Sequence, residues 1–517
     1  MSIRALALPV LLTVAGGVSA AKKNEPALDG RVLAAMKKAT TFLVEKVSYR
    51  GGYLWNYAPD FSRVWGELEA KPTMMWIEPP GTPAMGHLFL DAYHATGDEY
   101  YYRAAEKAAE ALIWAQLPCG GWAYMADFAG EASLRDWYKR VYDGYRWPAQ
   151  EHSHYYGNAT FDDGGTVQAG ELLLRMYLER NDPKFRPALE KFIDFVLESQ
   201  YPIGGWPQRY PLRHDFPEGP DKEDYSSFIT INDGVHTNNI HFLIECYHTL
   251  GEQRVLEPIS RAMTCILALQ GGKPQAGWGL QHKLDVDYTP AHARPFEPAG
   301  YASHGTAEMI EDLMSFYRLT GNSKFLARIP DAFEFLETIA IPESEYHWFE
   351  ERRLPKRPGQ ILCPTFVEVG TNKGLYLHRT EGDIRTGKYY VDYDRENLID
   401  HYSSVRTIDL ARLKKEYEEL LNVPAEELTK NSPLKSTTPV TLPKYYSRWN
   451  SGEPTEENVR AIVAALDGKD YWPGKLPGVS SEYVGFGPDR LPDEVISMWS
   501  YIRNMTTLIG YHEKQKK

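Results

Sequence analysis

QYPIGGW, at residues 200–206, closes a helix-like stretch with a glutamine and then turns through a glycine–tryptophan corner. The pattern recurs as QLPCGGW at 116–122 and QGGKPQAGW at 270–278, and a related GGYLW stands at 51–55. The spacing of about 70 to 85 residues gives each unit room for two helices and a long loop. Glycine permits the tight turn out of a helix. The recurrence therefore predicts a repeat architecture.

The sequence between these corners reads as four helix pairs. Apolar residues recur with helical spacing on both sides of polar breaks. The breaks fall at Asp98, Asp182, Glu252 and Asn322, which are separated by 84, 70 and 70 residues. The expected pairs are 86–98 with 100–115, 166–180 with 185–199, 237–250 with 255–269, and 306–319 with 325–339. Further helices are expected before and after these pairs, near 31–47, 409–421, 456–467 and 492–513. Repeated helical hairpins predict an all-α fold, an (α/α) toroid or barrel whose long loops form a cleft at one end.

Residues 340–407 interrupt this helical rhythm. The stretch is charged and aromatic, and it contains strand-like text at 362–369 and 374–377. A loop of this size within a compact domain is usually functional. We therefore expect residues 21–517 to form a single toroid domain in which 340–407 is a functional loop region.

The N-terminus has the composition of a secretory signal peptide. Arg4 precedes an apolar run over residues 5–18, and Val18-Ser19-Ala20 supplies small residues for cleavage. We expect residues 1–20 to be removed and the chain to be secreted or periplasmic. No run reaches the length of about 20 apolar residues that a membrane span needs. The net charge of −13 argues against a nucleic-acid partner, and we expect a monomer.

Four cysteines are widely spaced and form no CxxC pattern: Cys119, Cys246, Cys265 and Cys363. They do not build a disulfide framework. One or two disulfides and buried free thiols both remain open.

The chain is rich in tyrosine (34) and tryptophan (13), and a flat ring beside a polar loop is a surface on which sugars stack. Trp206 and Trp278 are predicted to stack on a sugar or to frame the loops, and Trp122 is predicted to be structural. The alternative is that these rings only fill the core.

Two acidic pairs stand directly before predicted helices. Asp162-Asp163 and Asn232-Asp233 lie one repeat apart, on successive loops of the same toroid end. Asp and Asn commonly cap helix N-termini. Their oxygens are also the ligands that Ca²⁺ prefers. Capping and calcium binding both remain open on this pattern.

Arginines gather in the same loops although the protein is acidic: Arg209, Arg213, Arg294 and Arg379. Each could be an ordinary surface residue. Together they indicate a basic floor that could bind carboxylates through the guanidinium fork.

Five separated motifs, in order, resemble the pectate lyases of polysaccharide lyase family ten. They are ATFDDGGT at 159–166, GGWPQRYP to ITIND over 204–233, GWGLQH at 277–282, ARPFE at 293–297, and FVEVGTN to HR over 366–379. The resemblance covers about residues 85–395.

The resemblance implies a toroid that cleaves polygalacturonate or a related acidic polysaccharide by Ca²⁺-dependent β-elimination with an arginine base. Matched motif by motif, the base falls on Arg379 and the calcium ligands on Asp162 and Asp233. Asp163 stands where the family commonly has an asparagine, and we include it among the metal ligands.

The same matching assigns substrate binding to Arg294, and we add four further residues to the predicted binding surface: Arg209, Trp206, Trp278 and Asn232. The chain departs from the family pattern at Thr365, where an arginine is common. It also carries an acidic insertion between Trp206 and Asn232 (Glu218, Asp221, Glu223 and Asp224).

Two other functions remain open. An α/α-toroid glycoside hydrolase would use Asp162 and Asp233 as an acid/base pair and would need no arginine base. A non-catalytic protein that binds acidic polysaccharide would use the same tryptophans and arginines. Sensitivity to EDTA and the absorbance of an unsaturated product distinguish these alternatives.

Overall fold

The computed structural model describes residues 27–145, 151, 156–212, 224–382, 386–399, 404–435, 442, 444–446, 452–476 and 492–516. The predicted signal peptide, Arg213, and three acids of the insertion (Glu218, Asp221 and Glu223) lie outside these residues.

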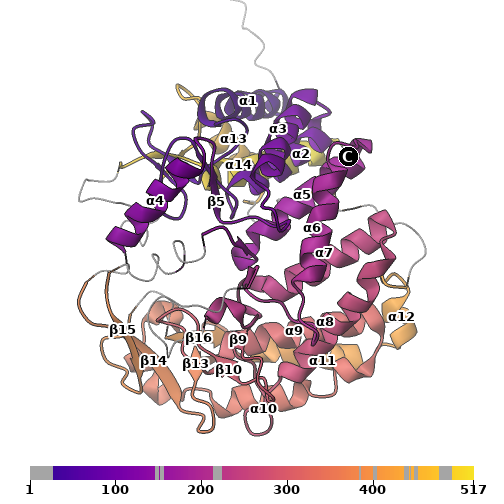
Figure 1. Ribbon diagram of the computed structural model, residues 1–517, viewed down its shortest axis with the longest axis vertical. Coiled ribbons are helices and arrows are strands. Elements are labelled where there is room, and N and C mark those ends of the chain that lie inside the picture. The colour runs from indigo at the N-terminus through magenta and orange to yellow at the C-terminus, as the bar shows by residue number, and fades with distance from the viewer. Residues whose placement is uncertain are drawn as a thin grey trace, which may run out of the picture.

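Helices dominate the fold and form two rows, one inside the other (Figure 1). The inner row consists of α14 (Met498–Gln515), α2 (Thr82–Thr96), α5 (Gly165–Arg180), α7 (Val235–Leu250) and α9 (Ser303–Thr320). The outer row consists of α1 (Leu28–Phe42), α3 (Glu99–Ala115), α6 (Arg186–Glu198), α8 (Leu256–Leu269) and α10 (Ile329–Thr338). Each outer helix packs on an inner one, as α3 does on α2 and α8 on α7. The predicted helical hairpins are therefore confirmed.

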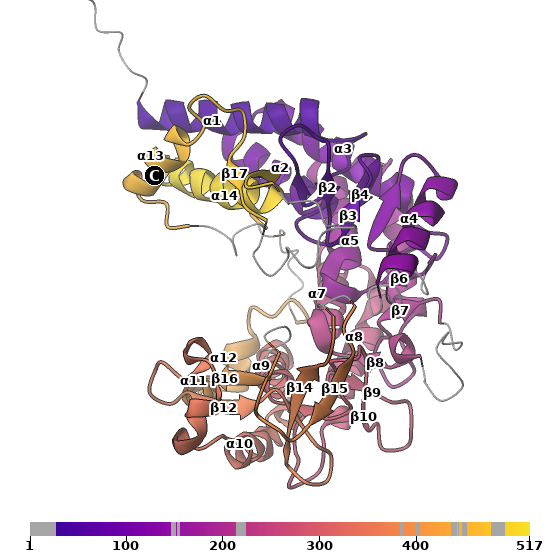
Figure 2. The ribbon, with the colours of Figure 1, turned by 90° about the vertical axis from the view of Figure 1, so that its left-hand side faces the viewer.

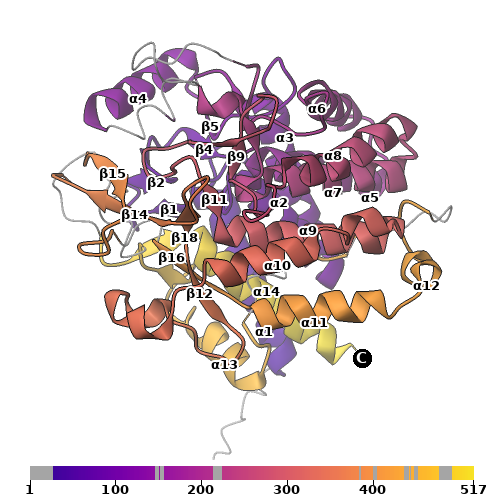
Figure 3. The same cartoon turned by 90° about the horizontal axis from the view of Figure 1, so that it is seen from below.

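The described helices make an open arc rather than a closed barrel (Figure 2). At one end of the arc, α9 packs against α10, α11 (Leu410–Leu421) and α12 (Ala425–Thr429), which Figure 3 shows from below. At the other end, α14 packs against α1, α2 and α13 (Glu456–Ala464). The predicted all-α toroid is thus right in its repeated unit, and the arc is not closed by these helices.

The predicted polar breaks mark the turns inside the hairpins. Four of the inner helices, α2, α5, α7 and α9, end in a residue with left-handed backbone, a conformation that favours glycine or asparagine: Gly97, Asn181, Gly251 and Gly321. The next residue turns its side chain back to accept a backbone N–H two residues on, which begins the outer helical segment: Asp98, Asp182, Glu252 and Asn322.

The glutamine of each corner holds one repeat to the next. The amide of Gln200 donates to the carbonyl of Gly204 in its own corner at 2.9 Å and to that of Pro258 in the next outer helix at 3.0 Å. Gln116 and Gln270 repeat this arrangement. Gly204 has φ +112, and a Cβ there would lie 2.4 Å from the carbonyl oxygen of Arg261. The recurring pattern is therefore a structural link between units.

The strands are short and lie in the loops at one end of the helices. Those of the 340–407 region are β12 (Ile361–Pro364), β13 (Phe366–Val367), β14 (Gly374–Arg379), β15 (Tyr389–Asp392) and β16 (Val405–Ile408). This region also holds the 3₁₀ turns η8 (Glu343–Trp348) and η9 (Glu351–Arg353). β14 lies between β13 and β15, and β12 pairs with β16. The predicted strand at 374–377 lies within β14. The predicted strand at 362–369 is interrupted at Thr365 and forms β12 and β13, which belong to different sheets, so the region holds more sheet than the sequence indicated.

The remaining strands form small antiparallel sheets. They are β1 (Asn56–Tyr57), β2 (Val64–Trp65), β3 (Glu69–Ala70), β4 (Met74–Trp76), β5 (Met125–Asp127), β6 (Ala159–Thr160), β7 (Arg209–Tyr210), β8 (Ile229–Thr230), β9 (Gln281–His282), β10 (Pro290–Ala291), β11 (Tyr301–Ala302), β17 (Pro473–Gly474) and β18 (Val495–Ser497). One sheet, in the order β17-β18-β1-β2-β3, joins the two ends of the chain. This sheet and the helix α4 (Glu131–Gly144) were not expected from the sequence.

All four cysteines are free thiols, so the open question about disulfides is answered. None of the helices in the described part of the chain has the length and apolar content that a membrane crossing requires.

Candidate functional site

Two loops with the same backbone conformation meet at one end of the inner helices. A short strand, β6 or β8, leads into a 3₁₀ turn, η3 (Asp162–Gly164) or η5 (Asn232–Gly234), and then into α5 or α7. Asp163 (φ 49) and Asp233 (φ 54) both adopt the left-handed conformation. The turns pack against each other. No side chain caps these turns or the helices that follow, so the capping interpretation is wrong.

Asp162 is the centre of a buried polar network. One of its carboxylate oxygens accepts hydrogen bonds from the hydroxyl of Tyr124 and from Arg294 Nη2, the latter at 2.6 Å. The other oxygen, Oδ1, is buried and has no hydrogen-bond partner in the structure. Burial opposes the ionisation of Asp162, but Arg294 and the hydrogen bonds outweigh it and hold its pKa well below the ordinary value. Asp162 is therefore an ionised carboxylate in a fixed orientation, and its Oδ1 has no hydrogen-bond donor.

Glu151 neutralises the two arginines beside Asp162. Arg294 binds it through two nitrogens, at 2.9 and 2.8 Å, and Arg209 Nη2 binds it at 2.9 Å. The Arg209 side chain is only 2% exposed and also donates to Tyr124. A substrate carboxylate cannot reach a guanidinium enclosed in this way, so the predicted contact with Arg209 is wrong. Arg209 instead stabilises Glu151.

Arg294 lies among four carboxylates. Besides Glu151 and Asp162, it has Glu297 at 3.3 Å and Asp233 at 4.0 Å. Its side chain is 10% exposed, which leaves part of the guanidinium facing the loops. The structure therefore brings the predicted substrate arginine against both predicted calcium ligands.

The ionised forms of Asp163 and Asp233 are destabilised by their surroundings. Asp163 is exposed, but desolvation by the groups around its carboxylate, together with the charge of Asp162, raises its pKa to about 6. Burial and the neighbouring Asp162 and Asp163 raise the pKa of Asp233 well above its ordinary value. Glu78, buried beside Asp163, has its pKa raised by burial and then by Asp163. A cation here would relieve the repulsion among these carboxylates.

Asn232 is buried, and its amide orients two of the acids. It donates to Asp233 at 2.8 Å and to Glu297 at 3.2 Å. A cavity of about 460 Å³ begins at Asn232 and Asp233 and continues between α7 and α9, where Thr237, His304 and Asp312 line it. Within the described ranges, no group of three or more histidine, cysteine, aspartate or glutamate side chains is arranged so that it could hold a metal ion.

Arg379 is the last residue of β14 and is half-buried. It pairs in register with Tyr389, whose ring packs on Phe296 at 5.4 Å. Because side chains alternate along a strand, Arg379 shares a face with Leu377, which packs in the same cluster as Phe296. Arg379 therefore projects toward the loop that carries Arg294. Its side chain forms no hydrogen bond or ion pair with the described part of the chain.

The tryptophans of the repeated corners are enclosed. Trp206 and Trp278 have no exposed surface and Trp122 has 1%. Each indole nitrogen donates to a carbonyl of the helix before its corner, at 2.8 Å in all three. The prediction that Trp206 and Trp278 stack on a sugar is wrong, because no face of either ring is accessible. They frame the loops, and Trp122 is structural as predicted.

Four residues of this network had no predicted role: Tyr124, Glu151, Glu78 and Glu297. Glu297 lies inside the ARPFE motif, so its proximity to Arg294 could have been read from the sequence. Glu151 lies 11 residues before Asp162 but outside any recognised motif, and Tyr124 and Glu78 lie farther away along the chain, so the fold brings these three into the network.

Comparison with known proteins gives one specific match. A family model described as pectic acid lyase matches residues 130–398, which is more than half of the chain. Among curated proteins, none matches the chain.

Several solved structures are similar to this chain at low identity. A family 10 polysaccharide lyase from Cellvibrio cellulosa is 17% identical, with a TM-score of 0.41, over 65% of this chain and 98% of the other. A mutant of the Cellvibrio lyase in complex with trigalacturonic acid is 16% identical, with a TM-score of 0.41, over 66% and 99%. An unsaturated glucuronyl hydrolase specific for heparin is 10% identical, with a TM-score of 0.38, over 95% and 99%. These likenesses are too distant to carry an argument.

Proposed function

The chain belongs to the pectic acid lyase family and is therefore a polysaccharide lyase, and we propose that it cleaves polygalacturonate or a related acidic polysaccharide by Ca²⁺-dependent β-elimination. The observation that carries the proposal is the pairing of Asp162, which keeps one buried oxygen unpartnered, with Arg294 at 2.6 Å. A carboxylate that can hold a cation and a guanidinium that can face a carboxylate thus lie side by side.

The proposed reaction needs charge neutralisation at the uronate carboxylate. Removing the C5 proton sends its electron pair into a new C4–C5 double bond, and the C4–O glycosidic bond breaks with its electrons on the leaving oxygen. Solvent supplies the proton that this oxygen gains. The intermediate stage is carbanion-like, because the C5 electrons delocalise into the carboxyl group. Positive charge next to that carboxyl group therefore lowers the barrier.

The three predicted ligands have the donor chemistry that a calcium ion prefers, although within the described residues they are not arranged to hold one until the ion draws them together. Asp162, Asp163 and Asp233 supply hard oxygen ligands on two adjacent turns, and Oδ1 of Asp162 lacks a hydrogen-bond donor. When bound, the ion would pair with the substrate carboxylate and withdraw electrons from it. Tyr124 and Arg294 hold the opposite oxygen of Asp162 and so fix its orientation.

Two arginines are candidates for the base. The motif match gives Arg379, whose side chain has no carboxylate partner among the described residues. Position favours Arg294, which lies between Asp162 and Asp233. Burial opposes the charge of Arg294, but Glu151 and Asp162 outweigh it and keep its pKa above the ordinary value. We therefore assign the base to Arg379 and charge neutralisation to Arg294.

Paired variants test this division of roles. Arg379→Lys and Arg294→Lys each keep a cation but change its geometry and pKa. We expect Arg379→Lys to lower kcat with little change in KM, and Arg294→Lys to raise KM. The reverse pattern would move the base to Arg294. If both variants kept the wild-type kcat and KM, neither arginine would belong to the machinery.

We also propose that the protein is exported and that residues 1–20 are removed. N-terminal sequencing of the protein recovered outside the cytoplasm tests this, and an intact Met1 there would contradict it.

A further inference from the structure

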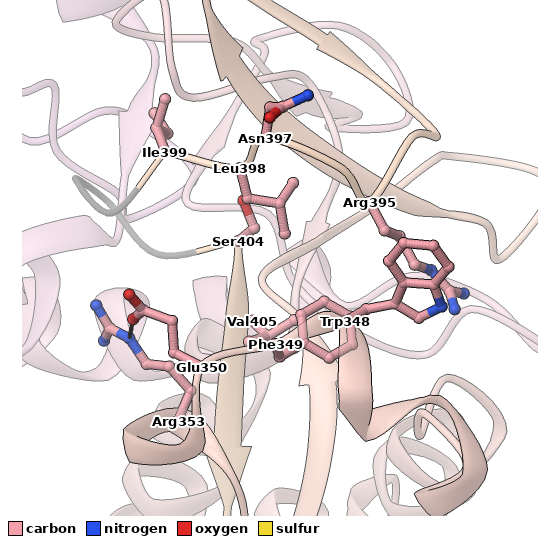
Figure 4. Close-up of a pocket in the computed structure, with 10 residues that line it drawn as sticks. All are labelled: Trp348, Phe349, Glu350, Arg353, Arg395, Asn397, Leu398, Ile399, Ser404 and Val405. Atoms are coloured by element: carbon pink, nitrogen blue, oxygen red, sulfur yellow. Dashed lines mark ion pairs between the residues drawn. The ribbon is translucent and has the colours of Figure 1, made fainter.

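Two neighbouring hollows open on the 340–407 region, away from the carboxylate network. The first, about 190 Å³, is lined by Trp348, Phe349 and Arg395 among others (Figure 4). The second, about 330 Å³, shares Arg395 and is lined by Asn372 and Tyr393 among others. We call them the Trp348 hollow and the Tyr393 hollow. Because one side chain borders both, a single extended ligand could occupy the two together.

These hollows lie on the opposite face of β14 from Arg379. Tyr376 lines the Tyr393 hollow. Alternation along the strand puts Tyr376 on one face and Leu377 and Arg379 on the other. The C-terminal end of the outer helix α10, at Thr338, closes the same hollow from the outside of the arc. The hollows are therefore separate from the proposed catalytic cleft.

The Trp348 hollow has the chemistry of a sugar site. Its floor is apolar, formed by Phe349, Leu398 and Val405, and Figure 4 shows the indole of Trp348 beside the guanidinium of Arg395 at one side. Trp348 is 42% exposed, so its ring is accessible, unlike the enclosed corner tryptophans. An aromatic ring accepts the apolar face of a pyranose, and a guanidinium pairs with a carboxylate at its edge.

The Tyr393 hollow repeats this combination. Tyr393 is 51% exposed, and the amine of Lys373 lies 5.1 Å from the centre of its ring. Asn372 adopts the left-handed backbone conformation, with φ 59, and its amide oxygen is buried without a hydrogen-bond partner.

The hollows are less acidic than the whole protein. Arg353, Lys373 and Arg395 line them against Glu345 and Glu350, and Glu368 accepts a hydrogen bond from the Tyr393 hydroxyl at 2.5 Å, so cations and carboxylates balance here. The whole chain carries −13. Arg395 contacts Glu345 through one nitrogen, and a guanidinium has five N–H donors. A polyanion is therefore repelled by most of the surface and less so here.

We propose that the Trp348 and Tyr393 hollows together form a second, non-catalytic binding site for an acidic polysaccharide chain. The class of ligand rests on the proposed function. The site would hold the polymer on the enzyme while the cleft acts on another stretch of it, so its effect depends on the length of the substrate.

Affinity electrophoresis in a gel that contains polygalacturonate and EDTA tests the proposal on the full-length protein. The variants are Trp348→Ala and Arg395→Gln. The matched controls are Trp114→Ala, which removes an equally exposed tryptophan of α3 (47%), and Arg135→Gln, which breaks an exposed arginine–glutamate pair on α4. We expect the dissociation constant to rise about fivefold to tenfold in the two variants and to stay unchanged in the controls. Melting temperatures check that every variant is folded.

Cleavage of a three-residue galacturonate oligomer provides the second readout. Since the hollows lie on the opposite face of β14 from Arg379, an oligomer bound in the cleft does not need them, and we expect its cleavage rate to be unchanged in Trp348→Ala. Unchanged retention in Trp348→Ala and Arg395→Gln would overturn the proposal. So would a cleavage rate that falls in step with retention, because the hollows would then belong to the cleft. The wild type could also be retained by the polygalacturonate gel, lose this retention in Trp348→Ala, and yet cleave no uronate. That result would contradict the proposed function and support the second binding site.

Discussion

Replacing Tyr124 by phenylalanine removes one oxygen from the centre of the network. The hydroxyl donates to Asp162, lies 3.1 Å from Glu151, and accepts from Arg209 Nη2 at 3.0 Å. Asp162 keeps Arg294, and Arg209 keeps Glu151, so the change orphans no charge. A hydrogen bond to a charged group contributes about 1.5 to 3 kcal/mol. Since the partners remain paired, we expect Tyr124→Phe to lower the free energy of unfolding by about 2 kcal/mol.

The same change should loosen calcium binding more than it loosens the fold. Tyr124 holds the oxygen of Asp162 that faces away from the proposed ion, and loss of such a partner typically weakens metal affinity by about 10- to 100-fold. Urea unfolding of the EDTA-treated protein gives the stability, and titration calorimetry with CaCl₂ gives the affinity. Tyr138→Phe is the matched control, because its hydroxyl lies 3.3 Å from the sulfur of Met125, a weak acceptor.

The reasoning would be refuted if Tyr124→Phe bound calcium as tightly as the wild type. In that case the orientation of Asp162 would not depend on this hydrogen bond. A stability loss no larger than that of Tyr138→Phe would show that the buried network contributes nothing to folding.

Three further outcomes are expected. The pKa of Asp163 is raised to about 6 in the folded protein, and that of Asp233 is also raised. Their protonated forms therefore add to the free energy of unfolding at acid pH, and this contribution is lost as pH rises through about 6. The rise in melting temperature caused by Ca²⁺, which needs both carboxylates ionised, should therefore grow over that range, and a pH-independent rise would contradict this. Gln200→Ala should lower the free energy of unfolding by about 2 to 3 kcal/mol in urea titrations, since two carbonyls lose their donor, and a loss typical of an exposed substitution would show that the link is dispensable. Trp206→Phe should lower stability by about 2 kcal/mol without changing KM, and a raised KM with unchanged stability would restore a sugar-binding role.

The repeat could be predicted from the sequence because its signals are local. A left-handed residue, a side chain that accepts a backbone N–H two residues on, and a glutamine before a glycine corner all recur within a few residues of one another. The strands at 362–369 and 374–377 were predictable for the same reason. The sheet of β17, β18, β1, β2 and β3 was not, since it pairs segments from the two ends of the chain.

The same distinction between local signals and contacts of distant segments applies to the candidate site. Asp162, Asp233 and Arg294 lie in recognisable motifs, and the fold brings them together. Burial could not be read from those motifs. Arg209 is enclosed by its partner Glu151, which is 58 residues away in sequence, and Trp206 is covered by the helices it joins. Arginine and tryptophan in a loop motif suggest contact with a ligand, but here the packing of the fold buries both side chains.

The most direct test of β-elimination is the ultraviolet absorbance of the unsaturated uronide product. Polygalacturonate is incubated with the enzyme at alkaline pH, first with Ca²⁺ and then with EDTA. We expect a rise in absorbance that EDTA abolishes and that both Asp162→Asn and Arg379→Ala remove. Reducing ends released without any rise would contradict it, because they would indicate a hydrolase that uses the same carboxylates.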